Sequence, residues 1–374
     1  MRICVLIDAW DPVWGGGQTH VWEIANRLVR KGWQIDIFTR ALSEGNITRK
    51  ESIEILTKDK LRVIRVGRVS EFNNVPSRLI WLIKVVIHVW KYHQKKPYDL
   101  IHAHAFLPAI PGKMLQILIN RPLVYTVHGS PLMDVSPNSI GAWIERILLT
   151  GIKFDREISV GERFLKYPNL NRNIAIIPNG VNLELFKATT RQRMHSNISI
   201  LWVGRFDKIK GIPILLTAFA KVIRNNQKLK LKLVGFGLEK KTYEHLAHKL
   251  NLTKSVEFVG KKTLKQLALI YRTADLFILP SLSEGQPVTL FEAMASCIPV
   301  IATDVGDNAK FVKEGTNGWL VKPGNIENLA QVLKSACSSK KLKIMGQKGR
   351  QLMESHFSWN KSVHETEKLY LSLL

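Results

Sequence analysis

Short apolar runs alternate with amphipathic stretches along most of the chain. In the first half, the apolar runs predict strands at 3–7, 34–39, 61–66, 100–102, 123–127, 157–160 and 174–177. Apolar positions recurring every three to four residues predict helices between them, at 19–31, 78–94, 108–119, 140–153 and 162–167. Apolar strands that alternate with helices are typical of a parallel sheet covered on both faces.

The second half repeats this alternation. Strands are predicted at 198–203, 229–234, 256–259, 276–279, 300–303 and 318–321. Helices are predicted at 212–225, 241–250, 264–272, 289–296, 326–335 and 342–354. We therefore expect an α/β protein with two doubly wound parallel-sheet domains. The polar stretch 187–197 should separate them, giving an N-terminal domain over 1–186 and a C-terminal domain over 187–356.

The charge of the chain is unusual for an otherwise ordinary globular composition. The formal net charge is +25, and both halves are basic, with +9 in residues 1–185 and +16 in residues 186–374. A solvated basic surface and attraction to an anionic membrane surface are both open interpretations. Because no nucleic-acid-binding motif accompanies the charge, we expect no nucleic acid partner.

Three further features bear on location. The three cysteines lie far apart without metal-ligand spacing, as in a reduced cytosolic protein. Asp8 and Asp11 follow the first apolar run too closely for a signal peptide. The longest apolar run, 79–90, is too short and too polar to span a bilayer. We expect a cytoplasmic protein, peripheral on the inner face of the cell membrane if the basic charge binds lipid.

The stretch 76–96, PSRLIWLIKVVIHVWKYHQKK, has two interpretations. A core helix is favoured, because the stretch is apolar nearly all round between Leu79 and Val89. The alternative is a helix on a membrane surface, with Trp81 and Trp90 as interfacial anchors.

The most informative chemistry lies in residues 280–306, PSLSEGQPVTLFEAMASCIPVIATDVG, where a strand, a glycine-containing turn, a helix and a strand follow one another. In open parallel sheets, ligands bind beyond the carboxyl ends of the strands. The start of a helix offers free N–H groups to a phosphate or sugar oxygen. Glu284 and Glu292, eight positions apart, indicate hydroxyl recognition, because carboxylates accept hydrogen bonds from neighbouring OH groups.

This stretch resembles the signature of the retaining nucleotide-sugar glycosyltransferases of the GT-B fold, glycosyltransferase family 4 (glycosyl transferases group 1). The resemblance covers most of the chain, and the order and spacing of its pieces are specific: GGGQTHVWEIANRLVRKGW, DLIHAH, TVHGS, IPNGVNLELF, LWVGRFDKIKGI, LVGFG, VEFVG and ESHFSW. It implies two Rossmann-like domains facing a cleft, with the nucleotide-sugar donor held mainly by the second. It also implies that a last helix, 357–374, crosses back onto the first domain.

In the first domain, the resemblance points to a glycine loop and a histidine. Gly15, Gly16 and Gly17 follow the first strand and allow positive φ and close approach of another molecule. The family implies contact with donor phosphate and acceptor there, although a flexible turn would look the same. His128 follows a strand, and a histidine at this position contacts the transferred sugar in the family. His104 should give structural support.

In the second domain, Arg205 and Lys210 follow the strand that ends at Gly204. A pyrophosphate needs cations from two directions, and arginine supplies bidentate bonds. Charge in the transition state builds on the leaving diphosphate, so both cations would also act as electrostatic catalysts. Lys208 is the alternative to Lys210, and an ordinary basic loop is the alternative to a site.

By resemblance, Glu284 binds the hydroxyls of the donor sugar, and Glu292 binds the ribose hydroxyls. The turn after Glu284 should approach sugar and phosphate through free N–H groups, except at its proline: Gly285, Gln286, Pro287 and Val288. Compensation of helix N-terminal charge is the alternative for either glutamate, worth only ~0.3–1 kcal/mol. The family pattern is broken at 307–310, DNAK, where another Gly and a Glu are usual, and at Cys297, where Gly is common.

The resemblance implies a hexosyltransferase that moves a sugar, with retention, from a UDP-sugar or GDP-sugar to an acceptor hydroxyl. The expected acceptor is a carbohydrate or a lipid-linked molecule of polysaccharide, lipopolysaccharide or glycolipid synthesis. No DxD motif occurs in a suitable loop, so no cofactor and no metal ion are expected, and Arg205 and Lys210 would replace the charge of a metal. A nucleotide-sugar epimerase of the same fold and a non-catalytic basic scaffold are the alternatives.

Overall fold

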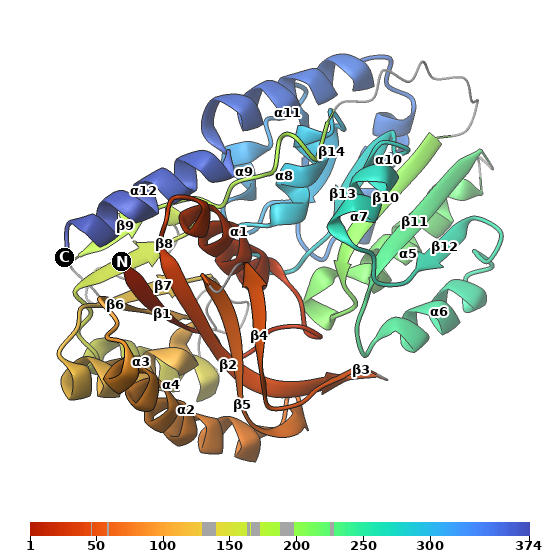
Figure 1. Cartoon of the computed structure of the whole chain (residues 1–374). Helices are drawn as coiled ribbons and strands as arrows, with labels where there is room; N and C mark the ends of the chain where they lie inside the picture. Colours follow the sequence, from red (N-terminus) through yellow and green to blue (C-terminus); the bar gives the residue numbers. More distant parts are fainter. Residues whose placement is uncertain are drawn as a thin grey trace. The chain divides into compact units, whose positions relative to one another are not determined.

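The computed structural model describes residues 1–45, 47–57, 60–128, 140–162, 165, 173–187, 198–224 and 228–374. Most of the expected helix at 162–167 and of the polar stretch 187–197 therefore lies outside the described residues. The chain divides into two compact units: unit 1, Met1–Asn179 with Trp359–Leu374, and unit 2, Gly180–Ser358 (Figure 1). Each is an α/β unit, as the sequence predicts.

The division falls between Asn179 and Gly180, whereas the sequence placed it between 186 and 187. The chain joins unit 2 earlier because Val181 and Phe186 pack into the core of that unit. The backbone N–H of Val181 also donates to the carbonyl of Phe357 at 2.9 Å. Because this bond holds Phe357 in unit 2, the last helix joins unit 1 from Trp359 onward and not from 357.

In the described part of unit 1, nine strands form one sheet in the order β4-β5-β2-β1-β6-β7-β8-β9, with β3 paired to β2. Their bounds are β1 Arg2–Leu6, β2 Gln34–Glu44, β3 Ile47–Arg49, β4 Ser52–Thr57, β5 Leu61–Glu71, β6 Leu100–His104, β7 Leu123–Val127, β8 Arg156–Ser159 and β9 Ile174–Ile176. The seven expected strands are present and pair in parallel. β3 and β4 were not expected: both pair antiparallel and expose most side chains, so they lack an apolar run.

Helices cover both faces of this sheet (Figure 1). Their bounds are α1 Gly16–Arg30, α2 Val75–Lys95, α3 Phe106–Ile119, α4 Ile140–Gly151 and α12 Trp359–Leu371. α2, α3 and α4 share one apolar core against one face of the sheet. α1 and α12 share the core on the other face.

In the described part of unit 2, six parallel strands form a sheet in the order β12-β11-β10-β13-β14-β15. The strands are β10 Ile198–Arg205, β11 Leu229–Phe236, β12 Val256–Val259, β13 Leu276–Leu279, β14 Val300–Thr303 and β15 Gly318–Val321. The helices are α5 Ile212–Ile223, α6 Lys240–Lys249, α7 Leu264–Tyr271, α8 Val288–Ala295, α9 Asn308–Phe311, α10 Ile326–Cys337 and α11 Leu342–His356. The strand order reverses between β10 and β13, and such a reversal is where a doubly wound sheet binds its ligand.

Candidate functional site

The loops after β10 and β13 meet where the strand order of unit 2 reverses. Lys210 ends a short 3-10 helix, η3 (Lys208–Lys210), in the loop after β10. Its Nζ lies 2.7 Å from Oε1 of Glu284, in the loop after β13. The N–H of Leu282 donates to the carbonyl of Ile209 at 2.7 Å, which fastens the two loops through their backbones. The structure therefore brings together a cation and a carboxylate that the sequence singled out separately.

Two glycines allow these loops to approach closely. Gly211 has φ +67, and a Cβ on it would lie 2.0 Å from the carbonyl oxygen of Pro280. Gly306, after β14, has φ +59, and its Cβ would lie 2.3 Å from the carbonyl oxygen of Glu284. Any side chain at either position would push the loop of Glu284 away. The position of Glu284 thus depends on three loops that follow three strands.

Glu284 is held by side chains as well as by its backbone. The hydroxyl of Ser281 donates to Oε1 at 2.6 Å, and Lys210 donates to the same oxygen. Among the described residues, Oε2 has no hydrogen-bond partner. The carboxylate is therefore oriented through one oxygen, and the other can accept hydrogen bonds from a ligand hydroxyl.

Arg205 is the last residue of β10, and its guanidinium forms an ion pair with Asp207 at 2.7 Å. Both side chains are about one third exposed. A diphosphate bound to Arg205 would compete with Asp207 for the guanidinium. Lys208 lies on the exposed side of η3, so the geometry supports Lys210 over Lys208 as the lysine directed toward Glu284.

Glu292 sits in the middle of α8, which begins at Val288 after Pro287. The side chain is buried, and the hydroxyl of Tyr271 donates to Oε2 at 2.9 Å. Burial raises the pKa of Glu292 to about 8, against the opposing effect of the Tyr271 hydrogen bond. The same burial, with the neighbouring Glu292, raises the pKa of Tyr271 well above its usual value. Glu292 is therefore largely neutral at pH 7 when no ligand is bound.

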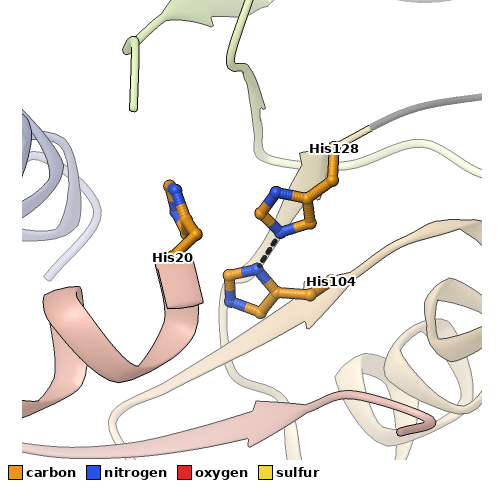
Figure 2. A group of neighbouring side chains, drawn as sticks. All are labelled: His20, His104 and His128. Carbon is orange, nitrogen blue, oxygen red and sulfur yellow. Dashed lines mark hydrogen bonds between the residues drawn. The ribbon is translucent and has the colours of Figure 1, made fainter. Parts of the chain in front are cut away.

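Unit 1 holds a second group of candidate residues, a cluster of histidines (Figure 2). His104 ends β6 and His128 directly follows β7, the neighbouring parallel strand. Their rings stack, with Nδ1 of His104 2.9 Å from Nε2 of His128. His20, on α1, lies edge-on to His128, and its Nδ1 is 2.9 Å from Oδ1 of Asn179. Sequence reasoning did not select His20, although it stands in the GGGQTH motif.

Burial keeps this cluster uncharged. It lowers the pKa of His20 to about 4 and the pKa values of His104 and His128 well below the usual 6.5. Among the described residues, these three histidines lie close enough to one another to hold a metal ion. Their ligand atoms lie within 4.8 Å of one another, and neutral imidazoles suit zinc-type ions. The His104–His128 hydrogen bond, however, already engages one nitrogen of each ring.

Comparison with known proteins identifies this arrangement. Residues 14–185 match the model of Glycosyltransferase Family 4, and residues 189–352 match Glycosyl transferases group 1. An uncharacterized glycosyltransferase of Methanocaldococcus jannaschii is 31% identical over 97% of this chain and 96% of its own. The chain belongs to glycosyltransferase family 4.

Solved structures give the fold of this glycosyltransferase as GT-B. Sucrose-phosphate synthase from Thermosynechococcus elongatus is 26% identical, with a TM-score of 0.88 over 100% of this chain and 98% of that chain. Anabaena HepE, solved with UDP and glucose, is 21% identical, with a TM-score of 0.79 over the whole of both chains.

In this glycosyltransferase, the glycines near the N-terminus differ from the expected loop. Gly15 is the N-cap of α1, with an extended φ of −161, and Gly16 and Gly17 form its first turn. None of the three has a positive φ. A Cβ on Gly17 would lie 3.5 Å from Cδ2 of His128, an ordinary contact. The expectation of a glycine loop was therefore wrong for Gly16 and Gly17, which belong to the helix. Glycine is permitted, though not favoured, in the first turn of a helix, so α1 begins earlier than predicted.

The departures from the family pattern also have structural explanations. Cys297 has φ +60 just after α8, the left-handed conformation that usually favours glycine at a helix end. Asp307 and Asn308 are buried at the start of α9. The amide of Asn308 donates to the carbonyl of Thr303 at 2.9 Å, which anchors this segment to the end of β14.

Proposed function

We propose that this glycosyltransferase moves a sugar, with retention of configuration, from a nucleotide diphosphate sugar to an acceptor hydroxyl without a metal ion. The observation that carries the proposal is the Lys210–Glu284 ion pair at the strand-order reversal, with Arg205 at the end of the adjoining strand. The acceptor is a carbohydrate or a lipid-linked molecule of the cytoplasm. Three free cysteines support a reducing compartment.

Arg205 and Lys210 would bind the diphosphate. As the bond from the sugar C1 to the phosphate oxygen breaks, negative charge accumulates on the leaving nucleoside diphosphate. Two fixed cations stabilise that charge more than they stabilise the intact donor, so they lower the barrier. Lys210 needs no reorientation for this role, because Glu284 and its own short helix already hold it.

Glu284 would accept hydrogen bonds from the sugar hydroxyls through Oε2, since Oε1 is engaged by Lys210 and Ser281. By the family resemblance, His128 of unit 1 would contact the transferred sugar as a neutral imidazole. Its Nε2 is bonded to His104, and Nδ1 makes no hydrogen bond to another described residue. We assign Nδ1 to the sugar contact, with His104 fixing the ring.

Glu284 is a poor nucleophile in this arrangement, because an ion pair and a hydroxyl stabilise its carboxylate. A double displacement of the glycosidase type needs two carboxyl groups about 5 Å apart. We therefore propose a front-face reaction, in which the acceptor oxygen bonds to C1 on the side from which the phosphate departs. The acceptor proton passes to the leaving phosphate oxygen.

The donor panel should begin with UDP-hexoses, since HepE was solved with UDP and glucose; GDP-sugars are the alternative from the sequence. Thermal stability is measured with UDP, GDP and ADP and their sugars. A ligand at about 100 times its Kd stabilises the binding unit by about 2.7 kcal/mol. A shift with none of these nucleotides would contradict the proposal.

Turnover is then compared in Lys210→Ala and Glu284→Ala, with Lys221→Ala as the matched control. Lys221 forms an exposed ion pair with Glu327 in the same unit. We expect losses of about 10²–10³-fold in kcat for the two site variants and no change for the control. Retention is read from the anomeric proton of the product. Donor conversion in the absence of any acceptor would indicate an epimerase instead.

A further inference from the structure

Three neighbouring helices of unit 1 expose an unusual amount of apolar surface. Of the 25 large hydrophobic residues that are exposed in the described chain, twelve lie on α2, α3 and α4. In the described part of unit 2, the four such residues are Ile209, Leu238, Leu269 and Ile344, which stand on different elements. Exposed apolar residues scattered singly are normal, but a concentration of this kind marks an interaction surface.

On α2, the exposed apolar residues form a stripe. Leu79, Ile83, Ile87 and Trp90 recur at spacings of four, four and three, so they fall within roughly 80° of the helix circumference. The opposite side of the helix packs into the core of the unit. α2 therefore combines the two interpretations of its sequence: one side packs into the core, and the other side is an exposed apolar surface. Trp81, an interfacial anchor only in the membrane-surface interpretation, is buried as the favoured core-helix interpretation predicts, and Trp90 is exposed.

α3 and α4 extend this surface. Ile117 is 76% exposed and Trp143 is 64% exposed, and each has exposed apolar neighbours one turn or less away on its own helix. All three helices pack on the same apolar core, so they cover the same face of the sheet, and Figure 1 shows them side by side. We call their outer surface the α2–α4 face.

The charge on these helices is of one sign. Lys84, Lys91 and Lys95 are exposed along one edge of the apolar stripe of α2, and Arg146 is exposed on α4. The single acidic residue in the sequences of the three helices is Glu145, and its side chain is buried. A helix surface that combines apolar side chains, tryptophan and lysine is typical of a membrane interface.

We propose that the α2–α4 face docks on the surface of a bilayer that contains anionic lipids. The apolar side chains would lie at the boundary between head groups and acyl chains, and the lysines would contact the acidic head groups. A second copy of the chain is a poor occupant, because it would bring the lysines of the three helices against one another. The exposed carboxylate of Glu51 beside α2 lies within ion-pair distance of His88 on the same helix. An anionic lipid surface complements both the apolar and the charged components.

The proposal deepens the proposed function, since docking would bring unit 1, which carries His128, to a surface where a lipid-linked acceptor resides. No described helix is long and apolar enough to cross the membrane, so attachment would be to one leaflet only. Docking can nevertheless be measured without any donor or acceptor. Its failure and the failure of the transferase assignment are therefore distinguishable.

The test is co-sedimentation of the full chain, at low salt, with phosphatidylcholine vesicles alone or mixed with phosphatidylglycerol. Two double variants test the apolar and the charged contributions to docking separately: Ile83→Asp with Ile117→Asp, and Lys84→Gln with Lys91→Gln. We expect binding to the acidic vesicles only. The lysine variant should lose about 30-fold in partitioning, since each lysine contributes roughly 1 kcal/mol near an anionic leaflet. The isoleucine variant should lose at least as much.

Matched controls come from unit 2, where Leu238 and Ile344 are exposed apolar residues and Lys343 and Lys348 are exposed lysines. The same substitutions there should leave partitioning unchanged, and thermal melts verify that all variants fold. Equal sedimentation with neutral and acidic vesicles would overturn the proposal, as would unchanged binding of either variant. A dimer in solution that the isoleucine variant dissociates, with no vesicle binding, would assign the face to a second copy instead.

Discussion

Glu292 allows a quantitative test of the site, because its carboxyl is buried and, among the described residues, forms no ion pair with a cation. The hydrogen bond from Tyr271 stabilises the charged form, but burial is the larger effect. The pKa rises from 4.5, the value expected in the unfolded chain, to about 8 in the folded protein. Between these values, the folded state holds a proton that the unfolded state has lost.

The direction in which stability changes with pH follows from this difference in bound protons. The stabilising contribution is complete below pH 4.5 and declines as the pH rises, until the folded carboxyl has itself ionised above pH 8. The decline is about 1.4 kcal/mol for each pH unit well below pH 8 and flattens as the folded carboxyl ionises, so it amounts to roughly 2 kcal/mol between pH 6 and pH 8. Glu292→Gln keeps the shape and an acceptor oxygen but cannot ionise, so this decline should be absent from the variant.

The assay compares thermal unfolding of the wild type and Glu292→Gln from pH 6 to pH 8. For a unit of this size, 1 kcal/mol corresponds to about 2–4 °C, so the gap in Tm should widen by roughly 4–8 °C in favour of the variant. Glu257→Gln is the control, because the Glu257 side chain is largely exposed in the same unit. A gap that stays constant over this range would refute a buried, neutral Glu292.

Three further predictions concern the donor site. Gly306→Ala should reduce turnover at least tenfold, because the new Cβ would meet the carbonyl of Glu284. Gly324 also has a positive φ but open space around it, so Gly324→Ala should lower Tm only. Asp207→Asn should tighten binding of a nucleoside diphosphate by up to about fivefold in calorimetry, since it releases Arg205 from an exposed pair worth ~0–1 kcal/mol; weaker binding would show that Asp207 helps to hold the ligand. Turnover after exhaustive treatment with EDTA should be unchanged, and recovery only on adding a divalent ion would contradict a metal-free mechanism.

Much of the fold follows from periodicity along the chain. The strands β1, β6, β7, β13 and β14 were predictable because they are buried on both faces and read as mostly apolar runs. β11 instead alternates apolar and polar residues, which is the period of a strand with one exposed face. β3 and β4 were not predictable in this way, because they are exposed strands at the margin of the sheet of unit 1. The boundary between the units was misplaced because Val181 and Phe186 belong to a core formed by residues far along the chain.

For the site, the sequence by itself determined which residue types stand at strand ends, and therefore which could carry chemistry. Glu284, Lys210 and His128 are identifiable in this way, because loops at the carboxyl ends of parallel strands share one edge of the sheet. Only the tertiary structure decided that Lys210 meets Glu284, that His20 joins His104, and which side of α2 is exposed. The physical reason is that pairing and burial depend on residues distant in the chain, and an apolar helix has the same periodicity whether its second face meets a core or a solvent boundary.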